Sequence, residues 1–301
     1  MRVRELATGF SSCPNDTFMF HGLVSGAVAV EGLRFVPEIA DIEALNLRAL
    51  DPARALAITK LSASVLAQVG DRYAVLGAGA ALGRGCGPLV VVRGAGFDAP
   101  GASDAPAVKV PRSLAELAGR KIAIPGEHTT AHLLLRVAFA EHAPAGASFD
   151  AVIMRFDRIM PAVAAGEVDA GLIIHESRFT YPAHGLVELA DLGALWERST
   201  GLPIPLGMIA GLRSLGAQTL AAVEDGLRRS VRLAFAEPDR AWPWIREHAQ
   251  ELDEDVCRRH IGLYVNDFSV ELGEEGRAAI EALLRRGRES GFLPPGPAPW
   301  V

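Results

Sequence analysis

A histidine and a glutamate, His175 and Glu176, lie in the stretch whose residue types could do chemistry, DAGLIIHESRFTYP (residues 169–182). The apolar residues before them predict a short buried strand over 169–174. In open α/β sheets ligands bind beyond the carboxyl ends of strands, and a neutral imidazole there can accept a proton near neutral pH. We expect Glu176 to face away from His175, because neighbouring residues of a strand point to opposite faces. A histidine with a structural role only is the alternative.

Three further polar segments each follow a predicted strand and lie at the start of a predicted helix. They are Asn15-Asp16, Lys60-Leu61-Ser62 and Thr129-Thr130. Hydroxyl groups, an ammonium group and the N–H groups of a helix start favour an anionic ligand. Each segment alone is compatible with ordinary helix capping, and the lysine with a solvated surface position. Because all of them follow strands, we expect them to converge on one anion-binding site.

Other kinds of catalytic site find little support in the sequence. His128 and His132 are four residues apart, but the chain has no HExxH motif and no CxxC pair, so we predict no metal site. The glycine-rich run GAGAALGRGCG (residues 77–87) does not open a clear helix, which argues against a dinucleotide fingerprint. Cys13 is more typical of a small buried residue than of a nucleophile. We therefore predict neither a metal site nor a dinucleotide site.

Composition excludes several classes of partner. The chain has 301 residues, of which 50% are hydrophobic and 22% charged, and a formal net charge of −6. An acidic chain without basic clusters is a poor match for nucleic acid or for an anionic membrane surface. No run of 18 apolar residues occurs, and MRVRELATGFSSCPND has no apolar segment typical of a signal peptide. We expect a cytoplasmic protein without membrane insertion.

Two alternations of strands and helices indicate two α/β units. For the first unit, strands are expected over 3–10, 33–39 and 55–59, and helices over 14–26, 41–50 and 62–70. For the second, helices are expected over 113–118, from Thr129 or Thr130 onward and over 157–165 with Asp157 as its cap, and strands over 120–124, 151–155 and 169–174. The layouts of the two units resemble each other.

Two apolar runs, 87–93 and 202–212, predict buried strands that pair with each other as crossovers between the units. The Gly-, Ala- and Pro-rich segment 94–112 predicts a linker or insertion beside them. Helices over 217–235 and 274–290 follow. We therefore predict a two-lobed α/β fold with a ligand cleft between the lobes. Its first lobe comprises 1–90 and 210–301, and its second lobe comprises 91–209.

The sequence resembles the 1,4-dihydroxy-6-naphthoate synthase family, which acts in the futalosine route to menaquinone. The resemblance covers nearly the whole chain and is most specific in CPNDTF (residues 13–18) and GLIIHE (residues 171–176). The other segments that carry it are ITKLSASVLAQVGDRYAVLGAGAALGRGCGPLVV, GEHTTAHLLL, FDRIMPAVAAGEVDAGLIIHESRFTYPAHGLVELADLG and GLPIPLG. The segment 94–112 departs from the family because it is longer than usual.

This resemblance implies a type 2 periplasmic-binding-protein-like fold and a lyase that needs no metal or organic cofactor. Its substrate would be a small carboxylate, cyclic dehypoxanthine futalosine. By motif match, His175 falls on the proton acceptor, and Lys60, Leu61, Ser62, Thr129 and Thr130 fall on substrate contacts, to which the residues themselves add Asn15 and Asp16 as candidates. A chorismate dehydratase-like enzyme and a non-catalytic solute-binding protein of the same fold are the alternatives. A homodimer formed through the C-terminal helices is compatible with the sequence.

Overall fold

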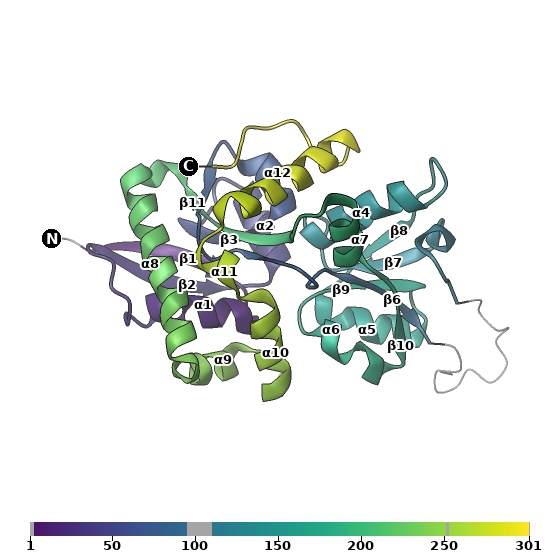
Figure 1. Ribbon diagram of the computed structural model, residues 1–301, viewed down its shortest axis with the longest axis horizontal. Coiled ribbons are helices and arrows are strands. Elements are labelled where there is room, and N and C mark those ends of the chain that lie inside the picture. Colours follow the sequence, from purple (N-terminus) through teal and green to yellow (C-terminus); the bar gives the residue numbers. More distant parts are fainter. Residues whose placement is uncertain (1–2, 95–109, 251–252, 301) are drawn as a thin grey trace. The chain divides into compact units, whose positions relative to one another are not determined.

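The structure is a computed structural model that describes residues 3–94, 110–250 and 253–300 (Figure 1). The chain divides into two compact units. Unit 1 comprises Met1–Cys86, His128–Thr130 and Leu202–Val301, and unit 2 comprises Gly87–Glu127 and Ala131–Gly201. Most of the predicted linker 94–112, at positions 95–109, lies outside the described residues.

The sheet of unit 1 has the strand order β2-β1-β3-β11-β4, with β5 also paired to β11. β1 is parallel to β2 and β3, whereas β11 is antiparallel to β3, β4 and β5. The strands are β1 (Arg4–Phe10), β2 (Leu33–Ile39), β3 (Ile58–Ser62), β4 (Tyr73–Val75), β5 (Ala81–Gly83) and β11 (Ile204–Leu212).

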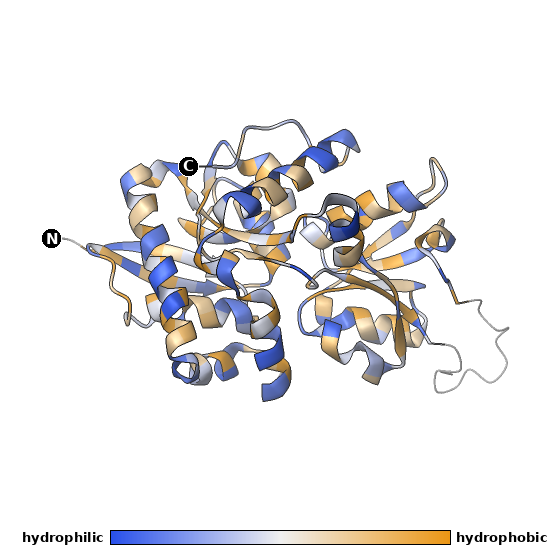
Figure 2. Cartoon of the chain, viewed as in Figure 1, coloured by the Kyte–Doolittle hydropathy of each residue, from blue (hydrophilic) through white to orange (hydrophobic). Residues whose placement is uncertain are grey.

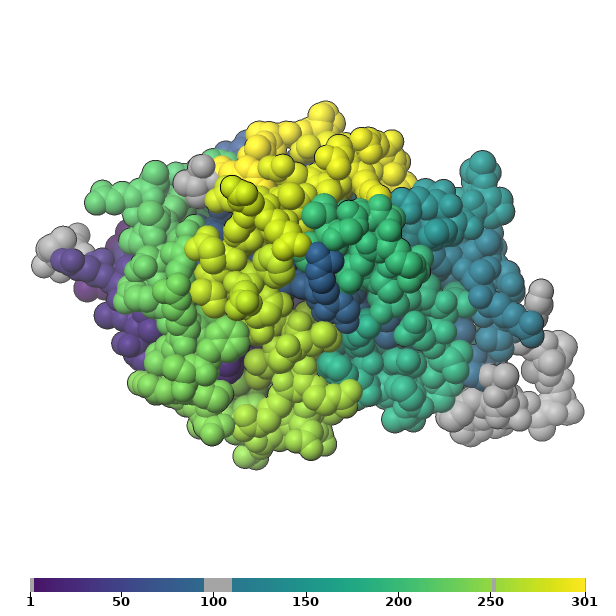
Figure 3. Space-filling view, viewed as in Figure 1, coloured from purple at the N-terminus to yellow at the C-terminus, as the bar shows by residue number. Residues whose placement is uncertain are grey.

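The helices of unit 1 come from both ends of the chain. They are α1 (Pro14–Val24), α2 (Ile42–Leu50), α3 (Leu66–Val69), α8 (Ala217–Ala236), α9 (Trp242–His248), α10 (Glu254–Tyr264), α11 (Asp267–Val270) and α12 (Gly273–Glu289). Much of the visible face of unit 1 in Figure 3 belongs to the yellow-green and yellow C-terminal elements.

The longest helix, α8, shows how the sequence pattern becomes a core. Apolar and polar residues alternate along it in Figure 2. Its apolar positions recur at helical spacing, as expected for a helix with one face in the core. All five residues of that stripe are buried: Leu220, Val223, Leu227, Val231 and Ala234. They join residues of β1 and α1 in one hydrophobic cluster, so the prediction of a helix over 217–235 is confirmed.

Unit 2 is a second, smaller α/β structure with the strand order β10-β6-β9-β7-β8. β7 is parallel to β8 and β9, and β6 is antiparallel to β9 and β10. The strands are β6 (Leu89–Arg93), β7 (Lys121–Ile124), β8 (Asp150–Ile153), β9 (Ala170–Ile173) and β10 (Leu186–Asp191). The helices are α4 (Thr130–His142), α5 (Phe156–Ala165), α6 (Ser177–Thr180) and α7 (Leu192–Thr200). The predicted α/β class with two sheets is confirmed.

The predicted pairing of 87–93 with 202–212 is wrong. β6 pairs with β9 and β10 in unit 2, and β11 pairs with β3, β4 and β5 in unit 1. A continuous apolar run shows that a strand is buried on both faces, but it carries no information about the neighbour that buries it. The neighbours of these two strands therefore could not be predicted from the sequence pattern.

Three local predictions also need correction. Lys60-Leu61-Ser62 is not a loop before a helix, because these residues end strand β3, which begins at Ile58 rather than at residue 55. Asp157 does not cap α5; the residue at the cap position is Arg155, whose guanidinium donates to the Asp157 carboxylate. Residues 114–117 form a short 3₁₀ turn instead of an α-helix.

The described helices include none that combines the length and the apolar character needed to cross a membrane.

Candidate functional site

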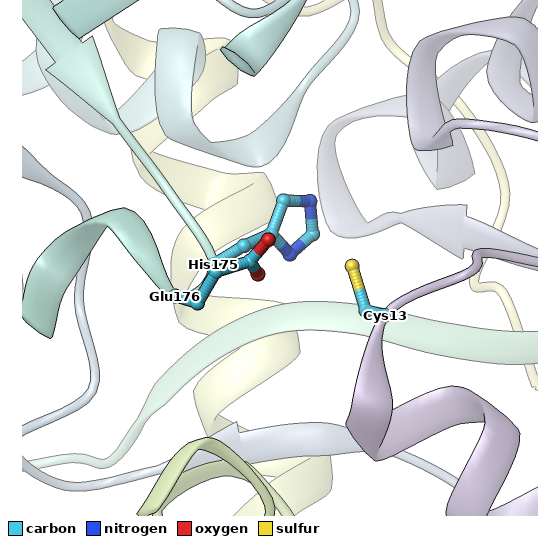
Figure 4. A group of neighbouring side chains, drawn as sticks. All are labelled: Cys13, His175 and Glu176. Atoms are coloured by element: carbon cyan, nitrogen blue, oxygen red, sulfur yellow. The ribbon is translucent and has the colours of Figure 1, made fainter. Parts of the chain in front are cut away.

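His175 lies just beyond β9 in unit 2 and has an unusual backbone. Its φ is 58°, and no other described residue except glycine has a positive φ. The left-handed region is costly for a residue with a Cβ and persists where the surrounding structure enforces it, often at functional positions. Figure 4 shows the histidine and the glutamate after it on the segment that leaves the strand. The structure thus singles out the same histidine as the sequence did.

The expectation that Glu176 faces away from His175 is wrong. A ring nitrogen of His175 and a carboxylate oxygen of Glu176 lie within 4.8 Å of each other. The strand ends at Ile173, so the alternation of faces along a strand no longer applies at these two residues. Glu176 is buried, at 7% exposure. At this separation the carboxylate and the imidazole can interact electrostatically.

An aromatic ring lies against His175. The ring of Phe156, the first residue of α5, meets the imidazole edge-on with 5.0 Å between ring centroids and 67° between ring planes. Contacts of this geometry are favourable and restrict the orientation of both rings. The imidazole is therefore packed on one side by an apolar wall, while its side chain remains partly exposed.

In unit 1, Asp16 and Lys60 form a buried ion pair between α1 and β3. The side chain of Asp16 is 0% exposed and that of Lys60 is 6% exposed. The backbone N–H and hydroxyl of Ser11 donate to the second carboxylate oxygen of Asp16, at 3.0 and 2.6 Å. Burial of two charges is tolerated only where they are paired and further hydrogen-bonded, as here. The surface interpretation of Lys60 is therefore excluded.

Asn15 connects this ion pair to the C-terminal part of unit 1. Its amide nitrogen donates to Asp16 Oδ1 at 3.1 Å, and its amide oxygen lies 3.1 Å from Nε2 of His260 on α10. Neither Asn15 nor Asp16 caps α1; the residue at the cap position is Cys13, labelled in Figure 4. Both side chains lie in the first turn of the helix and are buried.

Asn46 is the residue of this region that sequence reasoning missed. Its amide nitrogen donates to Ser62 Oγ at 2.9 Å, and its amide oxygen accepts from the backbone N–H of Ser62 at 3.0 Å. The same amide nitrogen lies 3.3 Å from the carbonyl oxygen of His128. Asn46 is fully buried on α2, beside Leu45 and Ala49. A polar residue on the buried face of an amphipathic helix was the signal that could have identified it.

The segment His128–Thr130 belongs to unit 1, and its polar groups are held there. Glu43 on α2 accepts from the backbone N–H of His128 at 3.0 Å and contacts its ring Nδ1 at 2.9 Å. Ser64 donates to the carbonyl oxygen of His128. Thr130 Oγ1 accepts from the backbone N–H of Ala63 at 2.8 Å and donates to the carbonyl oxygen of Leu206.

The structure thus brings most of the predicted residues together within unit 1. Lys60 and Ser62 lie two positions apart on β3 and so share a face, while Leu61 points to the other face and is fully buried. The sequence candidates in this cluster are Asn15, Asp16, Lys60, Ser62, Thr129 and Thr130. We call them, with Asn46, the polar cluster of unit 1. His175 and Glu176 belong to unit 2.

The two α/β sheets with their helices define a class, the proteins with a periplasmic-binding-protein-like fold. The structure of protein AF1704 from Archaeoglobus fulgidus superposes with a TM-score of 0.82 at 32% identity, covering 96% of this chain and 98% of the other. The alkanesulfonate-binding protein SsuA from Xanthomonas axonopodis pv. citri, bound to MOPS, superposes with a TM-score of 0.70 over 98% of this chain and 96% of its own. At 15% identity, SsuA shows the fold alone.

Within that class the chain belongs to the menaquinone-biosynthesis family, whose profile matches residues 6–289. It is 47% identical over 297 residues to the 1,4-dihydroxy-6-naphtoate synthase of Thermus thermophilus, covering 99% of both chains. The enzyme of that name from Streptomyces coelicolor is 46% identical over 298 residues, covering 98% of this chain and 96% of its own. The resemblance found in the sequence is confirmed, and so is the prediction that the chain is an enzyme.

Proposed function

We propose that this enzyme is a lyase that converts cyclic dehypoxanthine futalosine into 1,4-dihydroxy-6-naphthoate in the cytoplasm. The relatives named 1,4-dihydroxy-6-naphtoate synthase support the reaction. The observation that carries the mechanism is His175, a histidine in a left-handed backbone conformation at the end of a buried strand. Such a conformation is retained at a cost in free energy, which a residue with a chemical role would justify.

His175 is the proposed general base. A base must remove a proton from the substrate to start carbon–carbon cleavage, and formation of the aromatic ring then supplies driving force. Imidazole is suited to this step near neutral pH, because its ordinary pKa is about 6.5. Once the proton is transferred, the nearby carboxylate of Glu176 stabilises the imidazolium ion.

The polar cluster of unit 1 is the proposed binding site for the substrate's carboxylate. The Lys60 ammonium supplies a positive charge, and the hydroxyls of Ser62 and Thr129 supply hydrogen bonds. The hydroxyl of Thr130, whose proton goes to the Leu206 carbonyl oxygen, positions this segment. The hydrogen bonds that hold Ser62 and Thr130 fix their side chains before a ligand arrives, which lowers the entropy cost of binding. This preorganisation favours an enzyme with a defined small-molecule substrate.

The deciding experiment is turnover of cyclic dehypoxanthine futalosine by wild type and by His175→Asn. Loss of a general base is expected to lower kcat on the order of 10²–10⁴-fold while ligand binding persists. Product is measured by liquid chromatography with mass detection, and binding by calorimetry. His184→Asn, a histidine change in the same unit, is the matched control and should keep wild-type kcat. Undiminished kcat in His175→Asn would exclude the histidine as base.

Two conservative changes test the binding role of the cluster. Ser62→Ala and Thr130→Ala each remove a hydroxyl, so the Michaelis constant for the substrate should rise by about tenfold with a smaller change in kcat. Ser25→Ala, a cap residue of α1 outside the cluster, is the control. Unchanged kinetics in both test variants would remove these hydroxyls from the site.

The same assays separate the proposed lyase from the two alternatives. A chorismate dehydratase-like enzyme would consume chorismate in a parallel incubation, and a solute-binding protein would bind a ligand without forming product at long incubation. Either result with wild-type protein, together with no product from cyclic dehypoxanthine futalosine, would contradict the proposed function.

A further inference from the structure

His260 is a buried titratable residue that the proposed reaction does not use. It lies on α10, it is 1% exposed, and 245 positions separate it from Asn15, which its Nε2 contacts at 3.1 Å. Cys257 and Tyr264 lie on the same buried face of α10, and the Tyr264 ring packs on the imidazole with 4.6 Å between centroids. The position of the imidazole is therefore set by helix packing.

The direction of the hydrogen bonds from His260 to Asp16 follows from the acceptors present. A carboxylate can only accept, so the amide nitrogen of Asn15 must be the group that faces Asp16 Oδ1. The amide oxygen of Asn15 then faces His260, and Nε2 must carry the proton that this oxygen accepts. His260, Asn15 and Asp16 thus form a directed chain of hydrogen bonds.

This chain ends on the ammonium of Lys60. Asp16 Oδ1 accepts from both Asn15 Nδ2 and Lys60 Nζ, so the amide holds the same oxygen that orients the ammonium. Among the residues that the structure describes, no second ion-pair partner of Lys60 is found. The direction of the remaining ammonium N–H groups is therefore set through Asp16.

We propose that His260 is a positioning residue for substrate binding, which acts through Asn15 and Asp16 to hold the Lys60 ammonium in place. The proposal rests on the proposed function, because it assigns that ammonium to the substrate's carboxylate. Removal of the imidazole donor frees the Asn15 amide to rotate, and Asp16 then loses one of the hydrogen bonds that fix the buried ion pair. The position of the Lys60 ammonium is then less well defined, and the substrate's carboxylate binds more weakly.

The test compares His260→Leu with His260→Gln. Leucine removes the donor, whereas glutamine keeps an N–H group at a similar reach. We expect His260→Leu to raise the Michaelis constant about tenfold with a smaller effect on kcat, because one hydrogen bond to a charged network is lost. His260→Gln should bring the Michaelis constant most of the way back to the wild-type value. His248→Leu is the matched control, a histidine in the same unit whose ring bonds the Trp244 carbonyl oxygen outside the network.

A double-mutant cycle with Lys60→Met separates positioning from a general loss of stability. If His260 acts through Lys60, the effects of His260→Leu and Lys60→Met on the Michaelis constant will not add, because the histidine has no ammonium left to position. Additive effects, or a Michaelis constant that His260→Leu leaves unchanged, would overturn the proposal. Thermal unfolding of each variant identifies any that fails to fold, and if His260→Leu does, His260→Met, which also lacks the donor, replaces it in the cycle.

A labelling experiment tests the same point without turnover. The chain has three lysines, Lys60, Lys109 and Lys121. Acetylation by acetic anhydride, followed by mass spectrometry, compares buried Lys60 with exposed Lys121 in one sample. We expect Lys60 to react several-fold faster in His260→Leu than in wild type or His260→Gln. If Lys60 is labelled equally fast in His260→Leu and in wild type, the proposal is contradicted. If labelling of Lys60 is faster in His260→Leu but the wild-type protein does not turn over the substrate, only the proposed function is contradicted.

Discussion

At the scale of single residues, position 175 combines an imidazole with a left-handed backbone, φ 58°. The side chain is the part that the proposed reaction uses, while the backbone places it beyond β9, close to Glu176. The need for an imidazole and the need for a left-handed backbone can be separated by substitution, since asparagine and glycine accept this conformation and β-branched residues do not. The separation matters because it distinguishes a chemical role from a conformational one.

We therefore predict different stabilities for three variants of this residue. His175→Asn and His175→Gly should unfold near the wild-type denaturant midpoint, and His175→Val should be less stable by about 1–3 kcal/mol, the cost of a strained backbone. All three should lose activity. Denaturant unfolding followed by circular dichroism measures the difference. Equal stability of the valine and asparagine variants would show that the backbone here is not strained.

At the scale of elements, β9 must lie close to α5 to bring His175 to its place. Gly171 in β9 makes this possible, because a Cβ built there would lie 2.6 Å from Ile159 Cγ2 and 2.7 Å from Val163 Cγ2. Ile159 and Val163 are buried core residues of α5. The glycine in DAGLIIHE is thus required by the packing of a helix on the strand that precedes the histidine.

Gly171→Ala should lower the free energy of unfolding by about 1–3 kcal/mol, since it overpacks this contact, and it should also lower kcat by displacing the histidine segment. Gly262→Ala is the opposite case. That glycine lies in α10 with no atom within 4 Å of an added Cβ, so alanine should stabilise the helix by about 0.5–1 kcal/mol. Chemical denaturation of both variants measures the two changes in the free energy of unfolding. An unchanged free energy of unfolding for Gly171→Ala would contradict the packing argument.

At the scale of the whole molecule, burial couples stability to pH. Tyr73 is 1% exposed and donates to the carbonyl oxygen of Leu56 at 2.8 Å. Burial raises the pKa of Tyr73 to about 12, against the opposing effects of the Arg72 and Arg48 charges. The unfolded chain loses this proton near pH 10, whereas the folded protein keeps it. Stability should therefore fall as pH rises from about 10 towards 12.

Tyr73→Phe should remove this part of the loss of stability at alkaline pH. The variant is expected to be less stable than wild type by about 1 kcal/mol at neutral pH, because the Leu56 carbonyl loses its donor. Its stability should then decline less steeply above about pH 10. Denaturant unfolding of both proteins over this pH range measures the two slopes, with Tyr181→Phe in unit 2 as control. Equal slopes of stability against pH for wild type and Tyr73→Phe would contradict the raised pKa of Tyr73.

Much of the architecture could be predicted from local patterns. The strand over 33–39 and the helix over 217–235 follow from their periodicity, and the class of fold follows from the alternation of strands and helices. The pairing of β6 and β11 could not be predicted, because buried strands are apolar on both faces whichever strand lies beside them. The face of Glu176 was predicted wrongly because the strand ends two residues before the histidine.

For the candidate site, the sequence by itself determined the family and drew attention to His175, Lys60, Ser62 and Thr130, because residue types and motifs are local properties of the chain. Only the tertiary structure decided that Lys60 is buried against Asp16, that Asn46 holds Ser62, and that His260 holds Asn15. Hydrogen bonds between residues up to 245 positions apart depend on how helices pack on the sheet. That packing is a property of the folded chain as a whole, which no local pattern records.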